Sequence, residues 1–317
     1  MGEKIKNPEN RKKIFSTVRK FIPAIGLVVL FILFALTTNG RFLKINNLRT
    51  LIMQSSITMV AAVGTAFVMT HNNLDFSLGG ACALAAVLSF LVTGTNLVLF
   101  FILCVVFGII CGLFSALLHI KGQIPAFMAG MCIMFAGRGV AESVAATHTM
   151  MQFQAADLNN FTVILIVVLA VVLIGAFLFN YTKIGKYQKL IGANPKAAQL
   201  SGIPVNKYKT IAFVISGVTL GIAACLTIIR SPGIVGSTGT NLETNVLLAL
   251  CLGGLSMSGG SSSRISSAVI GTLIFFILNN GLTLWGVNAD YVDIIRAVFF
   301  LTTVAISTDR SQKDLVV

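Results

Sequence analysis

Charged residues are scarce in this chain, and acidic residues are the scarcest. Only 10% of its 317 residues are Asp, Glu, Lys or Arg, against 56% that are hydrophobic, whereas soluble domains carry about 25% charged residues. So few charges cannot cover the surface of a soluble protein of this size, which excludes that class. Long unbroken apolar runs, such as residues 163–179, favour membrane-spanning helices over the alternating strands of a β-barrel.

The chain also lacks the motifs of an enzyme or a nucleotide-driven motor. It has no phosphate-binding loop of the G-x-x-x-x-G-K-[ST] type, no H-E-x-x-H zinc motif and no Ser-His-Asp set. The three histidines, His71, His119 and His148, lie far apart in sequence, which argues against a shared metal site. The six cysteines show no C-x-x-C spacing and lie in apolar segments, which is typical of buried thiols between helices.

Ten apolar segments are long enough, or nearly so, to cross a bilayer, which needs about 20 residues. They cover residues 21–38, 50–70, 76–93, 97–118, 124–145, 161–179, 209–229, 244–258, 265–284 and 291–307. We therefore predict an all-α, polytopic membrane helical bundle of about ten transmembrane helices, with eight to ten as the range. The first segment follows a basic stretch but lacks a small-x-small cleavage site, so we expect an uncleaved helix rather than a signal peptide.

The basic residues predict the orientation of these helices. With the N-terminus inside and ten spans, 17 of the 23 Lys and Arg residues fall in inner segments and four in outer segments, as the positive-inside rule requires. Both termini are then cytoplasmic. We divide the chain into a basic tail (1–20), a transmembrane domain (21–308) with a cytoplasmic loop at 180–208, and a C-terminal tail (309–317). The net charge of +13 points to anionic lipid and a cytoplasmic partner and not to nucleic acid, because the charges lie between apolar runs.

A short capped helix is predicted within this cytoplasmic loop. Asn194 suits the N-cap and Pro195 the first helical position, whereas Gly202 and Pro204 end the helix after one or two turns. A helix this short is marginal alone and must pack on something. The residues leave open whether it packs only on its own membrane domain or also on another protein.

Polar side chains inside or beside the apolar segments have more than one interpretation. Asp75, with Asn73 and Ser77 beside it, lies where the second and third segments meet. These three residues either line or gate a pathway, or they form a solvated turn at the inner membrane edge, or Asp75 caps the third helix. Asn279 and Asn280 either hydrogen-bond to a polar solute or join neighbouring helices.

Two charge pairs and several glycine pairs complete the set of unusual features. The spacing predicts structural ion pairs between Arg138 and Glu142 and between Asp293 and Arg296. Glycine pairs at 79–80, 253–254 and 259–260 either mark broken helices along a pathway or simply let helices approach closely.

Sequence motifs along most of the chain resemble the ribose-type branch of ABC importer permeases. The run IGANPKAAQLSGIPV resembles that family's coupling-helix loop, with Lys196 where the family usually has an acidic residue. Further similar motifs follow the family's order: LDFSLGG (74–80), IPAFMAGMCIMFAGRG (124–139), GSTGTNLE (236–243), LGGLSMSGGSSSRI (252–265) and LNNGLTLWGV (278–287). The chain departs from the family pattern at His71, Asn72 and Asn73, where two glycines are usual, and at residues 261–267.

The resemblance implies a permease subunit of an ATP-driven importer for a monosaccharide or a related small polar solute. It would lie in the cytoplasmic (inner) membrane of a prokaryote, with a second permease copy or paralogue. An ABC ATPase subunit would bind ATP and Mg²⁺, so this chain needs no cofactor. The residues implied to dock on that ATPase are Asn194, Pro195, Ala197, Ala198, Leu200, Ser201 and Gly202.

An extracytoplasmic substrate-binding protein is the further partner that the resemblance implies, with Glu243 as the candidate docking residue or, alternatively, a helix cap. An Ala198→Glu exchange would be expected to uncouple ATP hydrolysis from transport. The alternative function is an ion-coupled secondary transporter, which the small supply of buried acids disfavours.

Overall fold

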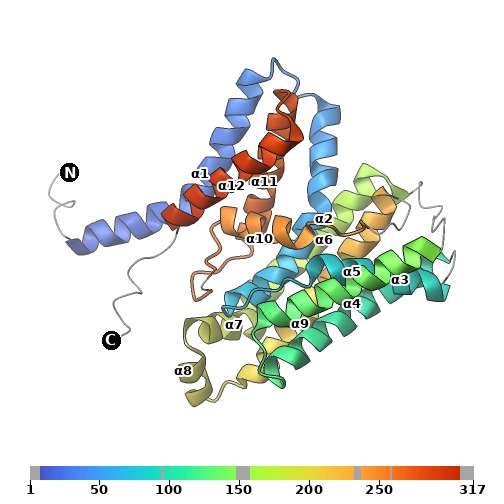
Figure 1. Cartoon of the computed structure of the whole chain (residues 1–317). Helices are drawn as coiled ribbons and strands as arrows, with labels where there is room; N and C mark the ends of the chain where they lie inside the picture. The colour runs from blue at the N-terminus through green and yellow to red at the C-terminus, as the bar shows by residue number, and fades with distance from the viewer. Residues whose placement is uncertain (1–7, 94–95, 148–157, 232–236, 258, 308–317) are drawn as a thin grey trace.

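The structure, a computed structural model, describes residues 8–93, 96–147, 158–231, 237–257 and 259–307, and these residues form α-helices and loops without any β-strand. In chain order the helices are α1 (Pro8–Thr37), α2 (Ile45–Thr70), α3 (Leu78–Thr93), α4 (Leu97–Ile120), α5 (Ala126–Thr147), α6 (Phe161–Tyr181), α7 (Lys183–Ala193), α8 (Pro195–Leu200), α9 (Val205–Arg230), α10 (Leu242–Leu252), α11 (Ser266–Leu284) and α12 (Ala289–Ser307). Figure 1 shows their arrangement.

The helical membrane bundle predicted from the apolar runs is confirmed. Within the described residues, six helices (α2, α4, α5, α6, α9 and α11) are long and apolar enough to cross a membrane, with 19 to 26 residues each. At 1.5 Å per residue they measure about 29–39 Å, which matches a hydrocarbon layer of about 30 Å. Shorter apolar helical stretches occupy residues 21–37, 78–93 and 242–252.

Each predicted apolar segment coincides with one helix, but the eighth was predicted too long. The sequence suggested 244–258, whereas α10 ends at Leu252. Gly254 takes a left-handed φ of +82°, and the Leu255 N–H returns to the Leu250 carbonyl at 3.0 Å. This glycine-dependent turn satisfies the last carbonyls of the helix and stops it early.

The centre of the bundle is α9, which packs along both α2 and α4. Gly108 and Gly112 of α4 face Gly217 and Gly221 of α9, so each helix carries a G-x-x-x-G spacing at the crossing. A Cβ added to Gly108 or Gly217 would overlap the carbonyl oxygen of the other. The two backbones therefore touch directly, which gains dispersion contacts that larger side chains would prevent.

A second cluster joins α1, α11, α12 and the first turns of α2, seen together at one end of Figure 1. Phe34 and Trp285 pack with ring centroids 4.9 Å apart, and the Trp285 indole N–H donates to the Thr37 hydroxyl at 3.1 Å. Asn47 and Asn280 exchange amide hydrogen bonds of 2.9 and 3.0 Å. These contacts tie the α1–α2 connection to the end of α11.

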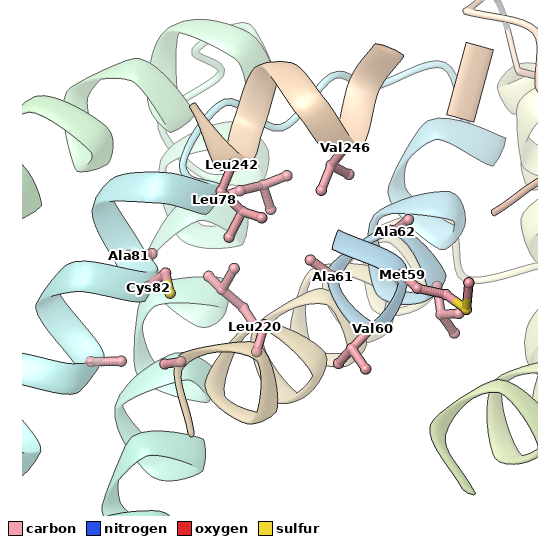
Figure 2. Close-up of a cluster of buried hydrophobic side chains, with 14 of the residues drawn as sticks. Met59, Val60, Ala61, Ala62, Leu78, Ala81, Cys82, Leu220, Leu242 and Val246 are labelled. Carbon is pink, nitrogen blue, oxygen red and sulfur yellow. The ribbon is translucent and has the colours of Figure 1, made fainter. Parts of the chain in front are cut away.

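Two of the apolar helices, α3 and α10, are too short to cross the membrane alone. The 16 residues of α3 and the 11 of α10 measure about 24 and 17 Å, and a non-helical segment precedes each of them. Their first turns meet inside the protein: Figure 2 shows Leu78 of α3 beside Leu242 of α10, with Leu220 of α9 close by. All three side chains are buried. The bundle thus contains two broken segments whose helical halves start near the same point.

The buried positions predicted for the cysteines hold for five of the six residues. Cys132, on α5, is exposed, whereas the buried ones are Cys82, Cys104, Cys111, Cys225 and Cys251. Position on a helix face, which composition does not give, makes the difference.

Candidate functional site

The predicted short helix is present and is capped as expected. The Asn194 side-chain oxygen accepts the N–H groups of Lys196 and Ala197, both at 3.0 Å. Pro195 begins α8, and Gly202, at a φ of +79°, follows its end. These caps satisfy the free backbone groups that make a six-residue helix unstable by itself.

One face of α8 packs inward and the opposite face is exposed. Ala198 is 5% exposed and packs against Ile191 and Ile203, whereas Leu200 is 83% exposed and Ala197 is also exposed. Ala198 thus faces the chain's own core at this position, and its predicted part in docking stays a prediction. A glutamate at this position would disrupt the packing of α8 itself.

The exposed side of α8 borders an open groove of about 590 Å³. Its lining residues are Pro195, Lys196, Gln199, Ile203, Pro204, Val205, Asn206 and Lys207. Lys196 and Lys207 belong to this lining and are exposed, and Lys183 and Lys186 are exposed on the preceding helix α7. An exposed apolar side chain, Leu200, on a segment with several exposed lysines suits a partner surface with an apolar pocket and an acidic rim.

Two contacts join α7 to α9, the helices that precede and follow α8. The Tyr187 and Tyr208 rings pack edge to face with centroids 4.7 Å apart. The Gln188 amide donates to the Tyr208 carbonyl at 2.6 Å. We call α7, α8 and the first turn of α9 the coupling unit, because these contacts make the three pieces one compact body.

The structure places the predicted polar residues near 75 at the start of α3. Asp75 is buried, and one of its carboxylate oxygens accepts the Ser77 N–H at 2.9 Å. This bond closes a local turn just before α3, since Ser77 precedes the helix, and all interpretations of Asp75 remain predictions. Asn73 is held elsewhere, because its amide contacts His71 and His119 at 2.9 and 3.1 Å.

The two predicted asparagines of α11 have different surroundings. The Asn280 side chain bonds to Asn47 of α2, which favours the interpretation that it joins neighbouring helices. Asn279 is half-buried, and its carbonyl accepts the Thr283 hydroxyl at 2.8 Å.

One predicted ion pair is confirmed and the other is wrong. Asp293 and Arg296 pair on α12 as their spacing indicated. Arg138 instead pairs with Glu243, at 2.6 Å and 105 residues away, and Glu142 is exposed. Glu243 is only 6% exposed, so its carboxylate offers no surface to a docking protein in this structure.

The glycine pairs lie at close contacts between segments. A Cβ on Gly79 would overlap the Glu243 carboxylate, and one on Gly80 would overlap the backbone of Met134 in α5. Gly253 likewise touches the Ser267 backbone. Gly79 and Gly80 lie in the first turn of the broken-segment helix α3. At this position both interpretations of the glycine pairs apply, because these residues allow close packing and also lie in a broken segment.

Two features of the structure were not predicted, and only the first of them could have been predicted from the sequence. The paired G-x-x-x-G spacings of α4 and α9 are visible in the sequence. The approach of His71 to His119 through Asn73 is not, because it needs the folded chain. His148 lies outside the described residues, and no cluster of metal-ligating side chains occurs among those that the structure describes.

Comparison with known proteins gives matches along nearly the whole chain. A family model described as "Branched-chain amino acid transport system / permease component" matches residues 47–304. The ribose import permease protein RbsC of Escherichia coli (strain K12) is 30% identical over 301 residues, which cover 90% of this chain and 93% of that protein. RbsC of Bacillus subtilis (strain 168) is 30% identical over 321 residues, covering 98% and 99%.

A xylose transport system permease protein, XylH of Haemophilus influenzae (strain Rd), is 26% identical over 366 residues, which cover 92% of this chain and 97% of XylH. No solved structure matched the chain. The family match exceeds half of the chain, and the similarity to the two ribose permeases extends over both proteins almost end to end. The chain therefore belongs to the ribose-type branch of the ABC importer permease family.

Proposed function

We propose that this chain is the transmembrane permease subunit of an ATP-driven importer of a monosaccharide or a closely related polar solute. The observation that carries this proposal is the end-to-end similarity to permeases named for ribose, together with those named for xylose, galactofuranose and fructose. ATP and Mg²⁺ are bound by a separate ATPase subunit, and a binding protein delivers the solute from outside.

The coupling unit is the docking site for the ATPase subunit in this proposal. Leu200 enters an apolar pocket on the ATPase, and the exposed lysines around α8 meet an acidic rim. Asn194, Pro195, Ala197, Ser201 and Gly202 shape and cap the helix. Ala198 acts from the inner face by fixing α8 on Ile191 and Ile203.

The proposed topology has ten spans with both termini in the cytoplasm. The six long helices, α1, α12 and the two broken segments make up this number. In support, the coupling unit, the end of α4 and the α10–α11 loop lie at one end of the bundle: Lys209 contacts His119, and Gly192 touches Gly260. Segments lie on the same side of the membrane when an even number of spans separates them, as the ten-span topology places these three.

The solute pathway lies along α5, between this chain and a second permease copy or paralogue. Glu142 is an exposed acid on a membrane-spanning helix, and a charge there is costly in lipid. Small exposed residues, Cys132, Ala136 and Gly139, share the exposed side of α5 with it. A water-filled pathway or a protein interface accommodates such a face, whereas hydrocarbon does not.

The test is reconstitution of the chain into proteoliposomes with an ABC ATPase subunit and a substrate-binding protein from the same organism. Uptake of labelled ribose, xylose and fructose is measured with and without ATP inside the vesicles. We expect ATP-dependent uptake of at least one of these sugars that also requires the binding protein. Uptake by the purified chain alone, driven by a proton or sodium gradient, would instead establish the secondary-transporter alternative.

Docking is tested separately with Leu200→Asp, which places a charge at the proposed apolar anchor. We expect the amount of ATPase that co-purifies with the permease to fall at least tenfold. Leu36→Asn, at an exposed position on α1, serves as a control for loss of a large apolar side chain. Full ATPase recovery with Leu200→Asp would refute the docking site while leaving the transport assay to judge the function.

A further inference from the structure

Residues 70–77, which we call the linker, comprise the last residue of α2 and the segment that leads to the start of the broken-segment helix α3. Asn72 in the linker has a left-handed φ of 62°. The Ser77 carbonyl accepts the Ala81 N–H at 2.8 Å, so the linker forms the entry into the first turn of α3. Any shift of the linker therefore moves the point at which α3 begins.

The first contact between the coupling unit and the linker runs through α7. Gly192 lies against the Thr70 carbonyl at the end of α2 so closely that a Cβ would overlap this oxygen. The same carbonyl accepts the N–H of Gly260 at 2.9 Å. Because backbone meets backbone without side chains between, displacement of α7 cannot be absorbed by a change of side-chain rotamer.

The second contact runs through α9 and consists of hydrogen-bonded side chains. Lys209 Nζ lies 3.4 Å from His119 Nε2, and the same His119 nitrogen lies 3.1 Å from the Asn73 amide nitrogen. His119 Nδ1 lies 2.9 Å from the Ile124 carbonyl and donates to it. Its Nε2 is then the acceptor, and Asn73 and Lys209 share the single lone pair of this nitrogen, with Asn73 the nearer donor. The remaining Asn73 proton points to His71 Nδ1, 2.9 Å away.

The charge states of the two histidines suit this network. Burial, followed by the charges of Lys209 and His119, lowers the pKa of His71 to about 3, and burial also lowers the pKa of His119. Both shifts favour the neutral imidazole, and His71 Nδ1 accepts in the tautomer that carries its proton on Nε2. Phe213, one turn after Lys209 on α9, packs against both imidazoles with ring centroids 6.1 and 6.0 Å away. Lys209 and Phe213, on one face of α9, thus contact the two histidines that the Asn73 side chain connects.

We infer that the linker is the element that carries movement of the coupling unit into the membrane domain, gripped on one side by Gly192 of α7 and on the other by the Lys209–His119–Asn73 bridge from α9. Both helices that flank α8 contact this eight-residue segment: α7 through Gly192 at Thr70, and α9 through Phe213 at His71 and, by way of His119 on α4, at Asn73. This segment opens into α3, whose Gly79 touches Glu243 at the start of α10. The inference rests on the proposed function, because it assigns a path to the force that ATPase docking supplies.

The positioning role of Asn73 and Lys209 is tested in the complete transporter with Asn73→Ala, Lys209→Met and the two combined. Lys121→Met, at an exposed lysine near His119, is the matched control. We expect solute uptake per ATP hydrolysed to fall about fivefold or more in both single variants, with ATPase recovery unchanged. The combined variant should be no worse than either single one, because both break the same bridge. Lys209→Arg should restore most of the ratio.

An unchanged uptake-to-ATP ratio in the two single variants would overturn the inference. So would equal losses of uptake and of assembled transporter, which indicate a purely structural role. Failure of the unaltered protein to bind an ATPase subunit would instead count against the proposed function, so the two failures are distinguishable.

A measurement on the unaltered protein keeps the inference testable if the variants assemble poorly. Hydrogen–deuterium exchange of the complete transporter is compared without nucleotide and with a non-hydrolysable ATP analogue. We expect amide protection in residues 70–77 to change at least threefold between the two states, together with residues 192–203. A linker whose exchange stays constant while that of 192–203 changes would refute the proposed path.

Discussion

Glu243 shows how the meaning of a single residue depends on its partner. The sequence places it at the end of an outer loop, where it reads as a docking residue or as a cap. In the folded chain it is buried, it pairs with Arg138 at 2.6 Å, and it faces Gly79 at the start of α3. A buried carboxylate needs such a cation, because an unpaired charge inside a protein is strongly unfavourable.

Replacing Arg138 with Leu should leave the Glu243 carboxylate buried without its partner. We expect a loss of about 3–5 kcal/mol of stability, the usual result of removing one member of a buried pair. The measurement is thermal unfolding of the purified protein in detergent. Adding Glu243→Gln should recover most of the loss, and Glu142→Gln, at an exposed site, should have little effect. A double variant as unstable as Arg138→Leu alone would contradict this explanation.

At the scale of elements, the crossing of α4 and α9 and the two broken segments determine the shape of the membrane domain. Gly108 and Gly217 let α4 and α9 touch backbone to backbone. The two short helices, α3 and α10, bring their first turns together (Figure 2). Helix N-termini inside a membrane domain carry partial positive charge, which is consistent with a carboxylate, Glu243, lying between them.

Gly217→Ala should separate α4 from α9, because the new methyl group meets the Gly108 carbonyl. We expect about 1–3 kcal/mol of destabilisation from overpacking, measured as a lower unfolding temperature in detergent. Gly26→Ala, where nothing lies within 4 Å of the added Cβ, should be neutral or slightly stabilising, since alanine favours helices. Equal effects of the two exchanges would show that the crossing tolerates an added methyl group.

At the scale of the whole molecule, three of the segments that the positive-inside rule assigns to the cytoplasm lie together at one end of the bundle. The coupling unit, the end of α4 and the α10–α11 loop contact one another there. The α1–α2 connection and the end of α11 meet through Asn47 and Asn280, and Arg49 at the start of α2 lies over the Phe161 ring at the start of α6. Both ends of the molecule are thus consistent with the ten-span topology.

This topology is tested by labelling single cysteines with a membrane-impermeant maleimide in a Cys132→Ser background, which removes the exposed thiol. Leu200→Cys and Gln123→Cys should react only in inside-out vesicles. Asn39→Cys and Gly286→Cys should react only in right-side-out vesicles. Labelling of position 200 from the outside would reverse the orientation and exclude the proposed docking of an ATPase there.

The sequence by itself determined where the helices lie and how α8 is capped, because apolar run length and the chemistry of Asn194, Pro195 and Gly202 are local properties. It also placed the chain in its family. Only the tertiary structure decided which residues meet. Arg138 was expected to pair with Glu142, four residues on, but its partner is 105 residues away. Ala198 turned inward while Leu200 stayed exposed, because the direction a short helix faces depends on what it packs against.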